Sequence, residues 1–461
     1  MAEPRDANEA SRPPLATRVL VATGLAAALA PLNSTMLSVA LRDIGASLGE
    51  SEATLTRSLV TPYLVASVVM QAPGGKLGDM LGHRRALALG QLVFLIGALV
   101  AVLAPGLVAL SISRVAMASA GALIVPSAMA LLRTELPAEV RGRAFGAFGA
   151  TMSLAAALGP LIGGQLTAAF GWRSVFAVNL VVLPISALLA RGGHAPTAAP
   201  KLGPRASFDW VGSVLLACSL ASWVLAVGRG RSPDVRLLGV GLVLLVAFVL
   251  HERRQAAPVV ELSLLGNLPY LAGGLLIALH NLAMYALLFE LPTVCGIVLG
   301  AGAQRTGPLL VSIMAPMVVC SLVAGRLTDA LGPRVVATMG TVATAAGFGI
   351  LLASPVDSLL SLVPGLVVVG GGLGLAMSPA QSASMGAVPP EKSGVAAGMT
   401  STLRYLGGIV GTLVLSLVMV PTSEPAVALA SHRTALTIFL VAACAAMPFA
   451  WLLSKTVGRR G

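Results

Sequence analysis

The sequence predicts an all-α polytopic membrane protein with about fourteen transmembrane helices, on three observations. First, 56% of its 461 residues are hydrophobic and only 10% are charged, whereas about a quarter of the residues of a soluble domain are charged. Second, continuous apolar runs recur along the chain, many near the ~20 residues that a helix needs to cross a bilayer. Third, a short polar segment is repeated. Transmembrane β-strands would alternate apolar and polar residues instead.

The predicted spans begin and end at charged and turn residues. They cover residues 19–41, 55–75, 86–104, 107–132, 144–170, 174–190, 209–228, 236–251, 268–291, 306–325, 335–353, 359–381, 394–420 and 434–454. The first run is longer than the core of a signal peptide. We therefore expect it to be retained as a span.

Basic residues are distributed unequally between alternate connections. With the N-terminus in the cytoplasm, 20 of the 30 Lys and Arg residues fall in inner connections and tails, and 8 fall in outer ones. Positively charged connections stay in the cytoplasm, so we expect both termini there. The net charge of +12 then has a topological cause, and no nucleic-acid partner is expected. The use of 26 Arg against 4 Lys suggests a GC-rich bacterial genome, which places the protein in a bacterial inner membrane.

An internal repeat predicts the architecture. Residues 75–84 and 325–334 keep the same chemical type at seven of ten positions, at a constant offset of 250. The copies join spans two to three and ten to eleven, so two six-helix halves are expected with two extra helices between them.

This plan divides the chain into seven parts. They are a cytoplasmic tail (1–18), the first half (19–190), a cytoplasmic loop (191–208), the extra helices (209–251), a second cytoplasmic loop (252–267), the second half (268–454) and a tail (455–461).

The repeated segments carry residues suited to a cytoplasmic gate. Glycines allow tight turns and close helix approach, an aspartate can accept hydrogen bonds at the amino end of a neighbouring helix, and the basic residues can pair with acids such as Glu135. A positively charged topology loop is the simpler explanation of one copy, but duplication favours a gate. The expected gate residues are Gly75, Leu77, Gly78, Asp79, Gly82, Arg84, Arg85, Gly325, Asp329, Gly332 and Arg334.

The segment GKLGDMLGHRR at 75–85 resembles the signature between helices two and three of the major facilitator superfamily. ALGPLIGG at 157–164 resembles the antiporter motif of that superfamily, and WRSVF at 172–176 and FDWVG at 208–212 resemble landmarks of its fourteen-helix drug/proton antiporters. This resemblance covers nearly the whole chain. It implies the major facilitator fold, a monomer, and export of drugs, antibiotics or metabolites in exchange for protons.

The antiporter motif consists of Gly159, Pro160, Gly163 and Gly164. Pro160 removes a backbone donor and bends the helix, while the glycines leave a bare face for close helix packing. A generic kink is the alternative interpretation. The position of the motif after the first gate segment favours a hinge or a proton-tight seal.

Two arginines lie well inside predicted spans rather than at their ends, where an unpaired charge costs at least ~2.5–3.5 kcal/mol. Arg114 occupies the place of a superfamily arginine implicated in proton coupling, and we expect it to face the cavity. Arg404 either faces the cavity or snorkels to the inner surface.

Asn33 stands where related drug exporters commonly have an aspartate. An amide cannot exchange protons, so Asn33 is expected at most to hydrogen-bond a substrate.

Glu290 is the candidate proton carrier, with His280 behind it because histidine titrates near neutral pH. An interfacial Glu290 in contact with water is the alternative. Because the cavity would hold arginines and few acids, we expect neutral, zwitterionic or anionic substrates rather than cationic dyes.

Other functions fit the sequence less well. Uptake of an anionic nutrient is disfavoured by the antiporter motif, and a membrane sensor would need a larger soluble domain than residues 191–208 provide. The chain has no Walker lysine loop, catalytic triad or metal-ligand cluster, and its four cysteines lack CxxC spacing. We therefore expect no enzymatic activity, no metal and no cofactor, with a proton gradient as the energy source.

Overall fold

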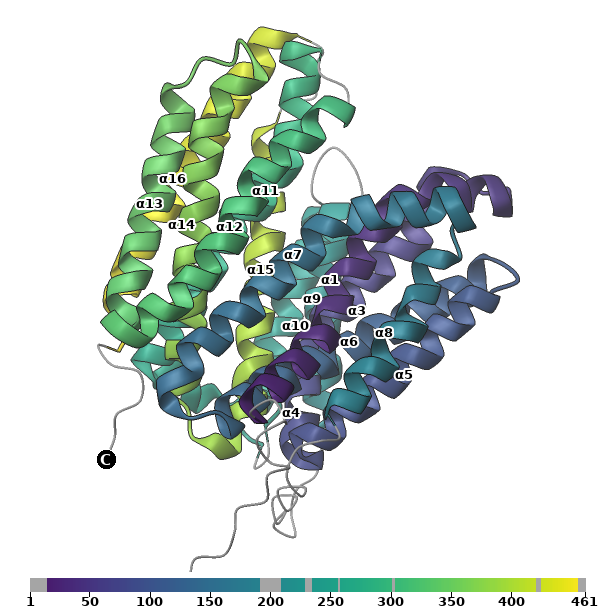
Figure 1. Ribbon diagram of the computed structural model, residues 1–461, viewed down its shortest axis with the longest axis vertical. Helices are drawn as coiled ribbons and strands as arrows, with labels where there is room; N and C mark the ends of the chain where they lie inside the picture. Colours follow the sequence, from purple (N-terminus) through teal and green to yellow (C-terminus); the bar gives the residue numbers. More distant parts are fainter. Residues whose placement is uncertain are drawn as a thin grey trace, which may run out of the picture.

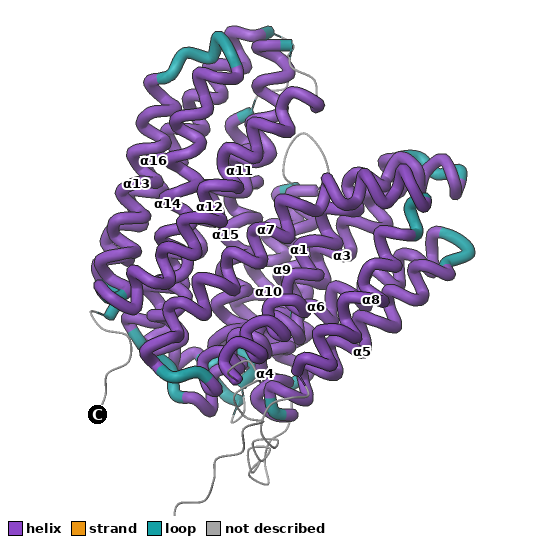
Figure 2. The backbone as a smooth tube through the Cα atoms, in the orientation of Figure 1, coloured by secondary structure: helices purple, strands orange, loops and turns teal. Residues whose placement is uncertain are grey.

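The computed structural model describes residues 15–190, 209–228, 234–255, 258–300, 303–419 and 424–454. Within these ranges the chain is helical and contains no strand (Figure 2). The predicted tail 455–461, the whole loop 191–208 and residues 1–14 of the tail 1–18 lie outside the described residues.

The first half contains the helices up to Ala190. They are α1 (Leu15–Leu48), α2 (Glu52–Leu55), the π-helix η1 (Thr56–Val60), α3 (Thr61–Val69), α4 (Gln71–Leu81), α5 (His83–Leu103), α6 (Leu107–Glu135), α7 (Ala138–Phe170) and α8 (Ser174–Ala190). The second predicted span is thus divided among α2, η1, α3 and α4.

Two further helices, α9 (Trp210–Gly228) and α10 (Val235–Glu252), precede the second half. The second half comprises η2 (Leu262–Gly266), α11 (Leu268–Leu299), α12 (Ala303–Leu331), α13 (Pro333–Ala353), α14 (Leu359–Gly386), η3 (Pro390–Lys392), α15 (Ser393–Val418) and α16 (Pro425–Trp451).

Each predicted span overlaps a helix, and the helices are long enough for a bilayer in most cases. In the described ranges, nine helices are sufficiently long and apolar to cross a membrane, or ten when the bent α7 is taken as one span. Other predicted spans correspond to shorter apolar helices such as Ser174–Ala190. The polytopic membrane fold is confirmed, while the number fourteen stays a prediction.

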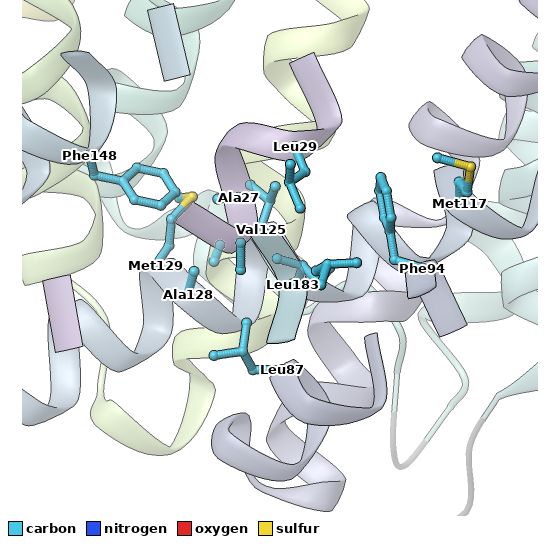
Figure 3. Close-up of a cluster of buried hydrophobic side chains, with 14 of the residues drawn as sticks. Ala27, Leu29, Leu87, Phe94, Met117, Val125, Ala128, Met129, Phe148 and Leu183 are labelled. Carbon is cyan, nitrogen blue, oxygen red and sulfur yellow. The ribbon is translucent and has the colours of Figure 1, made fainter. Parts of the chain in front are cut away.

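The apolar core is divided among several clusters. In the largest, Leu29, Phe94, Met117 and Leu183 are buried among the helices of the first half (Figure 3), and the cluster extends to Met385 and Val395 of the second half. In the second half, the rings of Phe348 and Phe439 pack 5.9 Å apart between α13 and α16.

The halves meet at one end and separate toward the other. The most extensive contacts between them join α4 to α15 and α7 to α12, and further contacts join α6 to α15 and α7 to α14. Figure 1 shows the halves close together at the end where α1 begins and diverging at the other. The hairpin of α9 and α10 packs on both halves, because its Leu216 and Leu220 share an apolar cluster with Val68 of α3 and Ile409 of α15.

Candidate transport site

One carboxylate from the first half caps a helix of the second half. Asp79, near the end of α4, accepts hydrogen bonds from the backbone N–H groups of Gly394 and Val395, both at 2.7 Å. These are among the first N–H groups of α15, which have no partner within their own helix and carry the positive end of its dipole. A carboxylate placed there ties α4 to α15.

The second copy of the repeat makes the reciprocal contact. Asp329 of α12 accepts hydrogen bonds from the backbone N–H of Arg143 at 3.2 Å and from its Nε at 2.9 Å, near the start of α7. Each half therefore contributes one aspartate to the other. We call these two contacts, with the residues that form them, the latch.

Glycines bring the helices close enough for the latch to form. A side chain at Gly75 would collide with the carbonyl of Gly394, and one at Gly325 would come within 2.8 Å of the carbonyl of Gly142. The repeated glycine thus has the same role in both copies, four residues before the aspartate.

The gate segment differs from the expected loop in one respect. Helix α4 continues to Leu81, so Gly75, half-buried Leu77, Gly78 and Asp79 are helical rather than part of a turn. The turn is confined to Gly82, with a φ of 85°, and Gly332 of the second copy, with a φ of 84°. Among the gate glycines, only these two have a positive φ, which glycine adopts more readily than other residues. Gly78 instead leaves room for the side chains of His83 and Ser127.

The basic gate residues have separate roles. Arg84 forms a two-pronged ion pair with Glu135, at 2.6 and 2.7 Å, which joins α5 to α6 inside the first half. Arg334 donates to the carbonyl of Leu453 at 3.1 Å and so holds the end of α16, while Arg85 is exposed.

Arg133 adds a contact between the halves that the sequence did not indicate. Its Nε donates to the carbonyl of Met385 at 2.7 Å, and its Nη2 donates to that of Val388 at 3.2 Å. In sequence Arg133 is one more basic residue at the end of a span, and its carbonyl acceptors have no sequence signature.

The antiporter motif bends α7 and packs it on α1. The helix axis changes direction by 42° between Val140–Ala156 and Leu158–Phe170, where Pro160 cannot donate a hydrogen bond to the preceding turn. A side chain at Gly159 would collide with Thr35, and one at Gly163 with Met36. Gly164 faces open space. The expectation that all three glycines serve close packing is therefore wrong for Gly164, which lies on another side of the helix.

Asn33 does not lie where a substrate would reach it. Its Nδ2 donates to Oδ1 of Asn179 at 2.6 Å, and the amide of Asn179 donates back at 3.3 Å. Both side chains are fully buried between α1 and α8. The expectation of a substrate contact at Asn33 is wrong, because buried amides satisfy each other.

Arg114 is 1% exposed and lies over an aromatic ring. Its guanidinium carbon is 3.8 Å from the centroid of the Tyr63 ring, a cation–π arrangement. Tyr63 is fixed in turn, because its hydroxyl donates to the carbonyl of Ala30 at 2.9 Å. The Nε and Nη1 atoms of Arg114 have no hydrogen-bond partner among the described residues.

Arg404 points to a polar group of its own half. Its Nη2 donates to Oε1 of Gln381 at 2.7 Å, so this side chain does not snorkel to the inner surface. Tyr285 and Tyr405 lie within electrostatic range of Arg404 and of Tyr63 in the first half. These residues, with Arg114, form a polar layer between the halves, which we call the central layer.

The carboxylate of Glu290 is fully buried against a histidine. Oε1 of Glu290 in α11 lies 2.6 Å from Nδ1 of His432 in α16, and the two side chains are 0% and 1% exposed. The alternative of an interfacial Glu290 is wrong. His280 is separate from this pair and places its Nδ1 2.9 Å from the carbonyl of Leu276. His432 was missed because the sequence gives no sign that α16 packs on α11 at this level.

A charged cluster lies at the base of the extra hairpin. Both oxygens of Asp209 are 3.1 Å from Nε2 of His251, and Asp209 also accepts from the N–H of Gly212 at 2.9 Å. Burial alone would raise the pKa of Asp209, but the hydrogen bonds from Gly212 and His251 and the charge of His251 hold it below its usual value. This cluster fixes the start of α9 to the end of α10.

Comparison with known proteins assigns the family. The model of the Major Facilitator Superfamily matches residues 23–412, which is most of the chain. The chain belongs to the major facilitator superfamily.

Relatives of this major facilitator include resistance and export proteins. It is 33% identical over 406 residues to the uncharacterised MFS-type transporter YvkA of Bacillus subtilis, which covers 87% of this chain and 90% of the relative. It is 30% identical to the tetracenomycin C resistance and export protein of Streptomyces glaucescens, over 87% of this chain and 75% of the relative.

The fold also matches solved major facilitators. The proton:xylose symporter XylE superimposes with a TM-score of 0.68 over 96% of this chain and 98% of its own, at 13% identity. In this major facilitator, the repeated segments lie where the two halves contact each other through Asp79 and Asp329.

Proposed function

We propose that this major facilitator exports small organic molecules across a bacterial membrane in exchange for protons, as a monomer with both termini in the cytoplasm. The family makes it a transporter, and several relatives are named as export or resistance proteins. No catalytic step is needed for this function. The basic residues of the inner connections support the orientation.

Alternating access follows from the latch. Asp79 and Asp329 close the end at which α1 begins, and the halves diverge at the other end (Figure 1). With that end in the cytoplasm, the halves contact each other on the cytoplasmic side and their helices diverge on the outer side (Figure 1). Breaking the latch would let the halves rock about the central layer.

One observation carries the proposed exchange of protons, namely the buried pair of Glu290 and His432. Two groups that share one proton are electrically neutral overall, whereas loss or gain of a proton leaves a buried charge. Such a pair binds and releases protons only when movement of the two halves admits water to it. Glu290 follows Tyr285 by five residues on α11, or ~7.5 Å along the helix, so a movement of α11 displaces both residues together.

Proton flux in proteoliposomes tests this proposal. The vesicles would hold a pH-sensitive dye, and a panel of compounds including puromycin and ethidium would be added on either side. We expect substrate moving out of the cytoplasmic side to drive protons the other way, and Glu290→Gln to abolish that flux.

A matched control is Asp357→Asn, which removes an exposed carboxylate far from the pair in sequence and should leave the flux unchanged. Substrate and protons moving in the same direction would overturn export in favour of uptake. Unchanged coupled flux in Glu290→Gln would overturn the assignment of the pair.

A further inference from the structure

The central layer contains two guanidinium groups without a carboxylate partner. Arg114 is almost completely buried, yet its Nε and Nη1 atoms have no hydrogen-bond partner among the described residues. Arg404 uses Nη2 on Gln381, but its Nε is buried and also unpartnered. Buried cations are expected to be paired or fully hydrogen-bonded. Both arginines therefore have N–H groups left to donate to a ligand.

The buried acids already described have other partners. Glu290 pairs with His432, while Asp79 and Asp329 belong to the latch. Among the described ion pairs, none includes Arg114 or Arg404. The layer consequently carries a local positive charge.

Tyrosine rings accompany these cations. The chain has only four tyrosines, and three of them, Tyr63, Tyr285 and Tyr405, lie within electrostatic range of one another here. The ring of Tyr285 lies against α15 at Gly408, where a Cβ would come within 2.9 Å of its Cδ2 atom. The missing side chain at Gly408 makes room for the ring.

We propose that the central layer binds an aromatic monoanion. Its carboxylate or phenolate accepts charge-assisted hydrogen bonds from Arg114 and Arg404, and its ring packs against Tyr63, Tyr285 and Tyr405. A cation of the same shape is repelled by both arginines. The inference rests on the proposed export function and specifies its substrate class.

The two arginines belong to different halves, which links binding to movement. Arg114 lies on α6 of the first half and Arg404 on α15 of the second. One anion that contacts both draws the halves together around itself. Substrate binding then favours closure of the open end.

Binding of three probes with the same ring tests the proposal on the full chain in lipid nanodiscs. The probes are 2-naphthoate, neutral 2-naphthamide and cationic 2-naphthylmethylammonium, measured by titration calorimetry. We expect 2-naphthoate to bind about tenfold or more tighter than 2-naphthamide, and the ammonium compound to bind weakest, because only the anion gains hydrogen bonds to two charged donors.

Substitutions test whether the two arginines cause the preference for the anionic probe. Arg404→Gln and Arg114→Gln should each weaken binding of 2-naphthoate about tenfold while changing that of 2-naphthamide by less than about twofold. Arg404→Lys should restore part of the preference. Arg254→Gln, at an exposed position after α10, should bind all three probes as the wild type does.

Thermal unfolding separates loss of a binding group from loss of the fold. If Arg114→Gln does not fold, Arg114→Lys and Arg404→Gln decide the matter. Equal affinity for the ammonium compound and 2-naphthoate, or an unchanged preference in Arg404→Gln, would overturn the proposal. The binding assay needs no proton gradient. If 2-naphthoate binds as expected but the proteoliposomes show no proton flux, the proposed proton exchange is contradicted and the anion site stands.

Discussion

The carboxylate of Asp79 and the backbone of Gly394 are joined across the two halves by a hydrogen bond of 2.7 Å. The aspartate lies four residues after Gly75, and a side chain at Gly75 would collide with the Gly394 carbonyl. Close approach and hydrogen bonding therefore depend on the same four-residue spacing. The second copy repeats this relationship between Gly325, Asp329 and the start of α7.

Asp79→Asn should open the latched end. The amide keeps one acceptor but loses the charge, and a hydrogen bond to a charged group contributes ~1.5–3 kcal/mol. We expect the equilibrium to shift toward separation of α4 from α15 by about tenfold or more. Spin labels at the exposed positions Arg85 and Glu391 would report longer distances by pulsed electron resonance. Asp329→Asn should do the same through the other contact, and unchanged distances in both would contradict the latch.

Gly75→Ala should prevent closure. The added methyl group meets backbone atoms of Gly394, which cannot move aside as a flexible side chain would. We expect coupled transport to fall about tenfold or more. Gly349→Ala is the control, since a Cβ at this helical glycine of α13 meets nothing within 4 Å. The control should gain ~0.5–1 kcal/mol from helix propensity, and equal loss of transport in both variants would argue against a steric latch.

Asn33→Ala should lower stability without affecting substrate affinity. It leaves the buried Oδ1 of Asn179 without its donor, a loss of ~1–3 kcal/mol in the free energy of unfolding, although the Asn179 amide nitrogen still donates to the carbonyl of Phe176. Asn33→Ala combined with Asn179→Ala should cost less than the sum of the single changes. Chemical denaturation and probe binding measure both quantities. A drop in affinity with unchanged stability would instead place Asn33 in the substrate site.

His432→Gln should uncouple protons from substrate. The glutamine cannot share a proton with Glu290, so the carboxylate would be held permanently in one state. We expect substrate-driven proton flux to disappear while probe binding in the central layer persists. The double variant with Glu290→Gln should behave like either single variant, because each change removes the same proton-sharing pair. Additive losses would show that the two residues act separately.

Asp209→Asn should destabilise the extra hairpin in a pH-dependent manner. The pKa of Asp209 is held below its usual value, so its stabilising contribution is present above the ordinary pKa of about 3.9 and is lost as pH falls through the lower folded value. The wild type should unfold at a higher temperature than the variant near pH 7. That gap should narrow below about pH 4. A gap independent of pH would show that the charge of Asp209 is not involved.

The sequence predicted the membrane fold and the general position of the gate well. Apolar runs determine where helices can cross a bilayer, since backbone groups in lipid must be satisfied within the helix. The repeat at residues 75–84 and 325–334 placed two equivalent segments at one end of the molecule. It also indicated that Asp79 could accept hydrogen bonds at a helix start, by the chemistry of the carboxylate alone.

Tertiary packing decided which residues meet. Helix α11 packs on α16 and α1 on α8, and these contacts gave Glu290 the partner His432 and Asn33 the partner Asn179. Neither pair has a sequence signature, because the partners are 142 and 146 residues apart. By itself, the sequence determined the helices, their repeat and the rarity of buried charge. Only the packed structure decided the rest, since rotation and crossing of helices fix whether a polar side chain finds a partner or stays available to a ligand, as Arg114 does.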